Sequence, residues 1–200
     1  MKIVIIGNSA AAVGAVEAIR EYNQTAQVMI LSEEPHMIYS RPMLSHYLAG
    51  EIDKARLAYR RADFYTRHNI QPVLDNRVVA IEPDAHVVHT RDGQTYAYDK
   101  LLISTGGVPI MPPIEGIGTQ GVFSFTRLDD VVGILDYIQM RASRHAVVIG
   151  GGMIGMKATD ALMKRGIHVT MVELAPRILS TALDETGSEI MSRLLAGAGV

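Results

Sequence analysis

The pattern of hydrophobic and polar positions changes period along the chain, and these changes predict alternating strands and helices. Residues 3–6 form an uninterrupted β-branched run, which is typical of a central parallel strand covered on both faces. Small residues follow, and apolar positions then recur at helical spacing from about Ala10 until a second strand pattern at residues 27–32. The chain is therefore predicted to begin with a strand, a tight turn, a helix and a second strand.

The same order of elements recurs in the second half of the chain. A hydrophobic strand is predicted at residues 146–149, a helix at residues 153–164 that Gly166 ends, and the next strand at residues 167–172. Because strands and helices alternate in both places, the predicted fold class is α/β. We expect two Rossmann-like, doubly wound units with mainly parallel sheets.

Short segments and turns lie between the two units. They predict an antiparallel β insertion with strands at residues 71–74, 77–81, 86–90 and 95–98. Residues 99–103 predict a buried parallel strand, and the small residues 104–107 that end it are expected beside the first turn, because ligands bind at the carboxyl ends of parallel strands. Further helices are predicted from about Pro42 and at residues 60–68, 127–141 and 184–195.

Residues 108–118 are rich in proline and glycine and are interpreted as a linker. The predicted domains are residues 1–113 and residues 114–200. The second shows only two clear strands before Val200, whereas a doubly wound domain usually has five or six. We expect either that a second subunit completes it, in a homodimer, or that the chain is part of a longer polypeptide, which we favour.

The small-residue turn after the first strand has the form G-x-S-x-x-A, a relaxed dinucleotide-binding fingerprint. Gly7 permits the sharp turn, Ser9 and Ala12 keep side chains out of the way, and the helix that starts near Ala10 directs free N–H groups at an anion. Glu33 lies about twenty positions after Ala12, where an acid can accept hydrogen bonds from ribose hydroxyls. The alternative is a tight turn with no ligand.

The second unit carries a full G-x-G-x-x-G at Gly150, Gly152 and Gly155, again between a strand and a helix. Glu173 ends its second strand, about twenty positions further on. One match could arise by chance, but two complete strand–turn–helix–strand–acid units in one chain indicate two dinucleotide sites.

The composition and net charge of the chain disfavour several classes of partner and cofactor. The 200 residues are 48% hydrophobic and 20% charged with a net charge of −2, which is ordinary for a globular protein and provides no basic surface for nucleic acid or membrane. The first residues fit a strand better than a signal peptide, so the cytoplasm is the expected location. The chain has no cysteine, and His46 has no ligand at metal spacing, so we expect no redox thiol and no metal.

With both fingerprints, the Tyr-Ser-Arg-Pro-Met-Leu-Ser segment at residues 39–45 and the Leu-Leu-Ile-Ser-Thr-Gly segment at residues 101–106, the chain resembles the FAD-dependent pyridine-nucleotide oxidoreductases over its whole length. Within them it is most similar to rubredoxin and ferredoxin reductases and to the amino-terminal flavin module of NAD(P)H nitrite reductase large subunits.

The resemblance implies which residues hold each cofactor. The FAD pyrophosphate and ribose would lie on Gly7, Ser9, Ala10, Ala11, Ala12, Glu33 and Glu34, and the rest of FAD would contact Arg41, Pro42, Val79, Thr105 and Gly106. NAD(H) would lie on Gly150, Gly152, Met153, Ile154, Gly155 and Glu173. An acid directly after the second strand of this unit, Glu173, favours NADH over NADPH, although Arg177 nearby weakens that preference.

Two departures from the family limit what the resemblance implies. Arg41, Pro42 and Met43 occupy the stretch where disulfide reductases carry a redox cysteine, so that chemistry is disfavoured. Lys157 stands where many relatives have a glutamate near the flavin and nicotinamide rings. It either stabilises negative charge on reduced flavin or is a solvent-facing helix lysine.

The implied function is that of an FAD-dependent NAD(P)H oxidoreductase that takes hydride from NADH and passes electrons to an external acceptor. The expected acceptor is a rubredoxin- or ferredoxin-like protein or a nitrite-reducing module. The main alternative is a nucleotide-binding or regulatory module without turnover. A dehydrogenase without flavin is disfavoured because it leaves the first fingerprint with no ligand.

Overall fold

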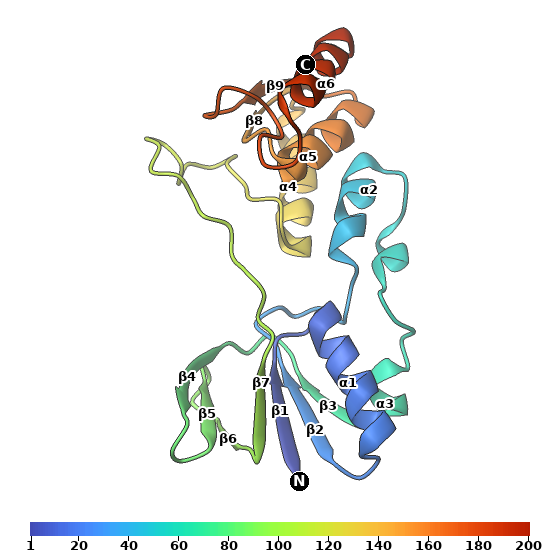
Figure 1. Ribbon diagram of the computed structural model, residues 1–200, viewed down its shortest axis with the longest axis vertical. Helices are drawn as coiled ribbons and strands as arrows, with labels where there is room; N and C mark the ends of the chain where they lie inside the picture. Colours follow the sequence, from blue (N-terminus) through green and yellow to red (C-terminus); the bar gives the residue numbers. More distant parts are fainter. The chain divides into compact units, whose positions relative to one another are not determined.

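The computed structural model describes residues 1–200, which form two compact units (Figure 1). The first unit contains Met1–Ser40 and Ala58–Val108, and the second contains Arg41–Leu57 and Pro109–Val200. A short segment from the first half of the sequence, residues 41–57, therefore belongs to the second unit. This assignment is not visible in the hydrophobic pattern of the segment.

The first unit is built on a four-stranded parallel sheet in the order β3-β2-β1-β7. Its strands are β1 (Lys2–Ile6), β2 (Gln27–Leu31), β3 (Ile70–Val73) and β7 (Lys100–Ile103). The prediction that residues 3–6 form a central parallel strand is confirmed. The assignment of residues 71–74 to the antiparallel insertion is wrong, because β3 pairs parallel with β2 and extends the main sheet.

Both faces of this sheet are covered, which is what the run of β-branched residues predicts. Ile3 and Ile5 pack against α1 (Ala10–Tyr22) and α3 (Phe64–Arg67) on one face. Val4 and Ile6 pack on the other face against an antiparallel sheet of β4 (Val78–Glu82), β5 (Val87–Thr90) and β6 (Thr95–Ala97). The predicted antiparallel insertion is thus confirmed for these three strands, and the unit has three layers (Figure 1).

Two details of the first unit differ from expectation. The helix predicted at residues 60–68 is a single turn, Phe64–Arg67, whose two aromatic residues at its start are buried while the flanking residues form turns. The strand predicted to be buried at residues 99–103 is parallel, but Leu102 is 37% exposed and Ile103 is 59% exposed. Exposure follows from position, because β7 is the outermost strand of the sheet.

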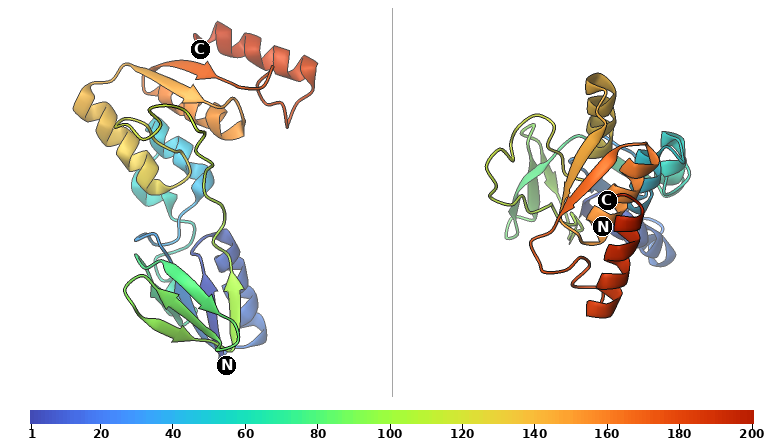
Figure 2. Two further views of the ribbon diagram at one scale, coloured as in Figure 1. Left: turned by 90° about the vertical axis from the view of Figure 1, so that its left-hand side faces the viewer. Right: turned by 90° about the horizontal axis from the view of Figure 1, so that it is seen from above.

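The second unit contains a two-stranded parallel sheet of β8 (His145–Ile149) and β9 (His168–Val172), joined by α5 (Met153–Lys164). The predicted order of strand, turn, helix and strand is confirmed, and α5 packs on both strands (Figure 2). The predicted helices are present as α4 (Leu128–Arg141) and α6 (Glu185–Gly197).

The segment of residues 41–57 enters the second unit as η1 (Arg41–Met43), α2 (Leu44–Ala49) and η2 (Lys54–Leu57). Helix α2 packs on α5 and α4, and the Arg165 guanidinium donates to the Leu48 carbonyl at the end of α2. Lys164 Nζ lies 2.7 Å from Glu51 Oε1. Of these two cations, Arg165 binds the free carbonyl end of α2, as a helix dipole favours, whereas Lys164 forms an ion pair with Glu51.

Between β7 and α4 the chain forms no helix or strand, in agreement with the linker predicted at residues 108–118. None of the helices has the length and apolar character that crossing a bilayer requires.

Candidate functional site

The first turn begins at Gly7, directly after β1. Its φ is +112°, and a Cβ at this position would lie 2.2 Å from the Ser104 carbonyl oxygen. The Gly7 N–H donates to the Leu31 carbonyl at 2.9 Å, while the Ser104 N–H donates to the Ile6 carbonyl at 2.8 Å. The turn is therefore held between the ends of β2 and β7, and only glycine fits there.

Helix α1 starts beside this turn with its first N–H groups available. Ser9 is the N-cap, and its side chain makes no capping hydrogen bond. Ala10 and Ala11 are exposed, while Ala12 is fully buried against the sheet. Uncapped N–H groups, exposed small side chains and the positive end of the helix dipole suit a pyrophosphate, so these residues fit the group that the fingerprint predicts.

A hydrogen-bonded pair that the sequence did not reveal supports the same turn. The buried Tyr65 hydroxyl donates to Asn8 Oδ1 at 2.9 Å, and Asn8 Nδ2 donates to the His36 carbonyl at 3.1 Å. Burial raises the pKa of Tyr65, and the Asn8 hydrogen bond opposes that shift. Asn8 is adjacent to Gly7, so the pair fixes the peptide that follows the glycine. The partners are 57 positions apart, and no local pattern links them.

The acids predicted after β2 lie at the same edge of the sheet as the first turn. Glu33 is exposed two residues after Leu31, the strand residue that accepts from Gly7, and Glu33 Oε1 is 3.7 Å from an Arg77 guanidinium nitrogen. Glu34 Oε2 accepts a hydrogen bond from the Tyr39 hydroxyl at 2.5 Å. The two neighbouring carboxylates therefore have different surroundings.

Three further residues predicted for the first site lie in β4 or directly after the end of β7. Val79 lies at an irregularity in the pairing of β4 with β5, so its backbone groups stand outside the regular ladder. Thr105 and Gly106 are exposed immediately after Ser104, and Gly106 has a φ of +70°. The expectation that the end of β7 lies beside the first turn is confirmed by the contact of Ser104 with Gly7.

The second turn repeats the design at the end of β8. Gly150 has a φ of +107°, and its N–H donates to the Val172 carbonyl at 2.7 Å. A Cβ at Gly155 would lie 1.8 Å from the Gly150 carbonyl oxygen, so α5 approaches the turn as closely as a glycine allows. A Cβ at Gly152, the N-cap of α5, would meet no atom within 4 Å. That open side leaves room for a pyrophosphate, and Met153 and Ile154 are exposed next to it.

Glu173 reaches back to this second turn. Its carboxylate accepts from the Ala175 N–H at 2.7 Å and from the Gly151 N–H at 2.5 Å. These two backbone donors, Ala175 first and Gly151 second, lower the pKa of Glu173. The carboxylate is therefore ionised at neutral pH, and each oxygen keeps a further lone pair that a ribose hydroxyl can use.

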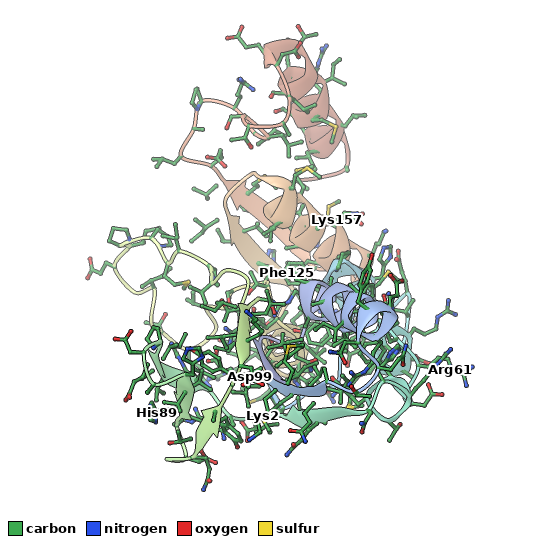
Figure 3. All side chains as sticks on the ribbon, turned by 60° about the horizontal axis from the view of Figure 1, so that its bottom comes forward. Lys2, Arg61, His89, Asp99, Phe125 and Lys157 are labelled. Atoms are coloured by element: carbon green, nitrogen blue, oxygen red, sulfur yellow. The ribbon has the colours of Figure 1, made fainter.

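Arg41, Pro42 and Lys157 belong to the second unit. Arg41 Nη1 donates to the Thr126 carbonyl at 2.8 Å, just before α4 begins, and Pro42 is exposed in η1. Lys157 is exposed on α5, where Figure 3 labels it. The role of these residues beside a flavin stays a prediction.

The His46 imidazole contacts a carboxylate. Its Nδ1 lies 2.5 Å from Glu51 Oε2, and the structure contains no group of three or more His, Asp or Glu side chains that could hold a metal ion.

Comparison with known proteins places these two turns in a family. The family model described as Pyridine nucleotide-disulphide oxidoreductase matches residues 1–200. The nitrite reductase (NADH) large subunit of Escherichia coli (strain K12) is 32% identical over 202 residues, which are 100% of this chain and 24% of that protein. Rubredoxin-NAD(+) reductase of Pseudomonas putida is 32% identical over 201 residues, 100% of this chain and 52% of that protein.

A solved structure has the same fold. The covalent putidaredoxin reductase–putidaredoxin complex contains a chain that superimposes with a TM-score of 0.89 and 29% sequence identity, covering 100% of this chain and 48% of that one. The chain thus spans between a quarter and about half the length of the relatives that it matches.

Proposed function

This chain belongs to the pyridine nucleotide-disulphide oxidoreductase family, and on that premise we propose that it is the nucleotide-binding part of an FAD-dependent NAD(P)H oxidoreductase. The observation that carries the proposal is the presence of two turns of one design. Each follows the end of a parallel strand, opens on a glycine at positive φ and leads into a helix whose N-cap makes no side-chain hydrogen bond. Two such turns fit two dinucleotides, and a flavoenzyme reduced by a nicotinamide needs both.

We assign FAD to residues 1–113 and NAD(H) to residues 114–200. On this assignment FAD contacts Gly7, Ser9, Ala10, Ala11, Ala12, Glu33, Glu34, Arg41, Pro42, Val79, Thr105 and Gly106. NAD(H) contacts Gly150, Gly152, Met153, Ile154, Gly155 and Glu173. Both lists are supported by the glycines at positive φ that open the turns and by the exposed Ala10, Ala11 and Gly152 beside them. We favour NADH over NADPH because the lowered pKa of Glu173 keeps this carboxylate charged, and it would repel a 2′-phosphate.

Bound FAD would supply the redox chemistry, because it can accept a hydride from NADH and release electrons to an acceptor. The residues of this chain would bind and orient the two nucleotides. The turns hold pyrophosphates, Glu33 and Glu173 hold riboses, and Lys157 presents a positive charge on α5. The 200 residues contain no cysteine, so no thiol of this chain takes part.

The acceptor that we propose is a small redox protein of the rubredoxin or ferredoxin kind, or a nitrite-reducing module. The names of the relatives support this class, since they include a rubredoxin-NAD(+) reductase, a nitrite reductase large subunit and a reductase captured with putidaredoxin. A cytoplasmic location and a homodimer are further parts of the proposal.

The test is whether the purified protein carries flavin and whether NADH bleaches it under anaerobic conditions. Gly7→Ala is the matched variant, because its Cβ would meet the Ser104 carbonyl, and flavin absorbance should be lost. Gly14→Ala is the control, since Gly14 is exposed on the same helix and its Cβ would meet nothing within 4 Å.

The results separate two functions. A yellow protein that NADH bleaches more readily than NADPH supports the oxidoreductase. A colourless protein that still binds NADH indicates a nucleotide-binding or regulatory module without turnover. Failure to bind either nucleotide contradicts the proposal.

A further inference from the structure

The loop after β9 contains the cation nearest in sequence to Glu173, and its contacts decide what that cation can do. Arg177 lies four residues after Glu173, a position from which a guanidinium could meet a 2′-phosphate. In the structure its Nη1 instead donates to the Leu183 carbonyl and to Ser188 Oγ, the latter at 3.1 Å. Arg177 therefore ties the loop to the start of α6.

The Ser188 hydroxyl links Arg177 to the backbone of the same loop through two hydrogen bonds. Its side chain is 1% exposed, and its Oγ donates to the Ile178 carbonyl at 2.8 Å while it accepts from Arg177. Residues 177, 178 and 188 thus form one closed hydrogen-bonded group. The Asp184 carboxylate, which accepts from the Gly187 N–H at 2.8 Å, begins α6 beside it.

The next two residues of the loop touch the glycine turn. The Leu179 N–H donates to the Gly151 carbonyl at 2.8 Å, and Leu179 is buried with a φ of +52°, which a leucine adopts only when surrounding contacts impose it. A Cβ at Gly151 would lie 2.8 Å from Ile178 Cγ2. Together with the bond from its N–H to Glu173, both backbone groups of Gly151 are bound by the segment of residues 173–179.

We infer that Arg177 is a positioning residue: by closing the loop onto Ser188 it seats Ile178 and Leu179 on Gly151 and so fixes the second phosphate turn and its ribose acid together. The inference rests on the proposed function of this turn as the NAD(H) site. It assigns Arg177 to the shape of the site for either nucleotide and not to recognition of a 2′-phosphate.

Two variants separate these roles. Arg177→Met removes the guanidinium and keeps the apolar stem, and Ser188→Ala removes the buried acceptor while the charge of Arg177 remains. Arg193→Met is the control, because Arg193 is exposed on α6 and its loss changes the net charge equally. The measurements are dissociation constants of NADH and NADPH by fluorescence titration of the purified protein, and hydrogen exchange of the Gly151 amide.

A positioning role predicts that Arg177→Met and Ser188→Ala each weaken NADH and NADPH by the same factor, about tenfold, as expected for losing a hydrogen bond to a charged group. The Gly151 amide should exchange faster in both, and Arg193→Met should match the wild type. If Arg177→Met weakens NADPH alone, or if both variants leave NADH affinity and Gly151 exchange unchanged, the inference is wrong. If the wild type binds no nucleotide, the proposed function fails, while the exchange rates still test the link from Arg177 to Gly151.

Discussion

The turns at residues 7–12 and 150–155 share a motif, yet different parts of the chain support them. The first is held by β7, through Ser104, and by the buried pair of Tyr65 and Asn8. The second is held by the segment directly after β9, through Glu173 and Leu179. One turn thus depends on contacts distant in sequence, whereas the other depends on its own strand–loop unit. The comparison teaches that two related fingerprints can be held in place by different parts of the chain.

The two units around these turns also differ in how far their sheets are covered. In β1 every residue from Ile3 to Ile6 is buried, because a helix layer and an antiparallel sheet cover the two faces. In β8, Val147 is 64% exposed and Ile149 is 53% exposed, and α5 packs on the two-stranded sheet. Within these 200 residues, two layers cover the strand before the first turn, whereas the strand before the second turn keeps exposed apolar side chains.

The largest effect on stability is expected at the last small residue of each fingerprint, which is Gly155 in the second turn and Ala12 in the first. Gly155→Ala places a Cβ 1.8 Å from the Gly150 carbonyl oxygen and should destabilise the protein by about 3 kcal/mol. The opposite exchange in the first turn, Ala12→Gly, should cost only about 1 kcal/mol, the difference in helix propensity. Chemical denaturation of both variants measures this, and equal losses would show that the two turns are packed alike.

The acid of the second turn provides the next largest effect. Glu173→Ala removes the acceptor of the Gly151 N–H and the proposed ribose contact together, so NADH affinity should fall about thirtyfold, or about 2 kcal/mol. Glu33→Ala, the equivalent change in the first unit, alters the site that we assign to FAD and should leave NADH affinity unaltered. Titration of both variants with NADH checks the difference, and a loss in Glu33→Ala as large as that in Glu173→Ala would contradict it.

A smaller effect is expected from the distant support of the first turn. Tyr65→Phe leaves Asn8 Oδ1 without its donor and should cost about 1 kcal/mol of stability and a corresponding part of the flavin affinity. NADH binding to the second turn should not change. Flavin retention after dialysis and an NADH titration measure the two effects, and full retention would show that Asn8 does not need Tyr65.

The smallest expected effect is the change with pH in the protection of the Gly151 and Asn8 amides from hydrogen exchange. The pKa of Glu173 is lowered by the Ala175 and Gly151 N–H groups, so its contribution is complete above the ordinary value of 4.5 and is lost as the pH falls through the lower value in the folded protein. Protection of the Gly151 amide should stay constant from neutral pH to about pH 5 and decrease below it. The Asn8 amide should show no such step, because Tyr65 is neutral throughout this range and its pKa is raised. A decrease at Gly151 that begins near neutral pH would rule out Glu173 as the cause.

The amino-acid sequence by itself determined the alternating elements, both turns and the acids that follow them. These features are local: a β-branched run, a glycine at positive φ and a helix start lie within about ten residues, and steric limits act at that range. The structure bears this out at β1 and β8, and Gly7 and Gly150 have the positive φ that the turns require.

Tertiary structure alone decided the other features of the fold and of the site. These features depend on contacts between residues that no hydrophobic periodicity in the sequence relates. The parallel pairing of β3 with β2, the exposed edge at Leu102 and the bond from Tyr65 to Asn8 depend on which elements become neighbours in the folded chain. Arg177 is a further example at short range: the sequence shows only that a cation lies near Glu173, whereas its hydrogen bonds to Ser188 Oγ and the Leu183 carbonyl become visible in the folded chain. A side chain binds the partner that folding brings within reach, and sequence spacing does not specify that partner.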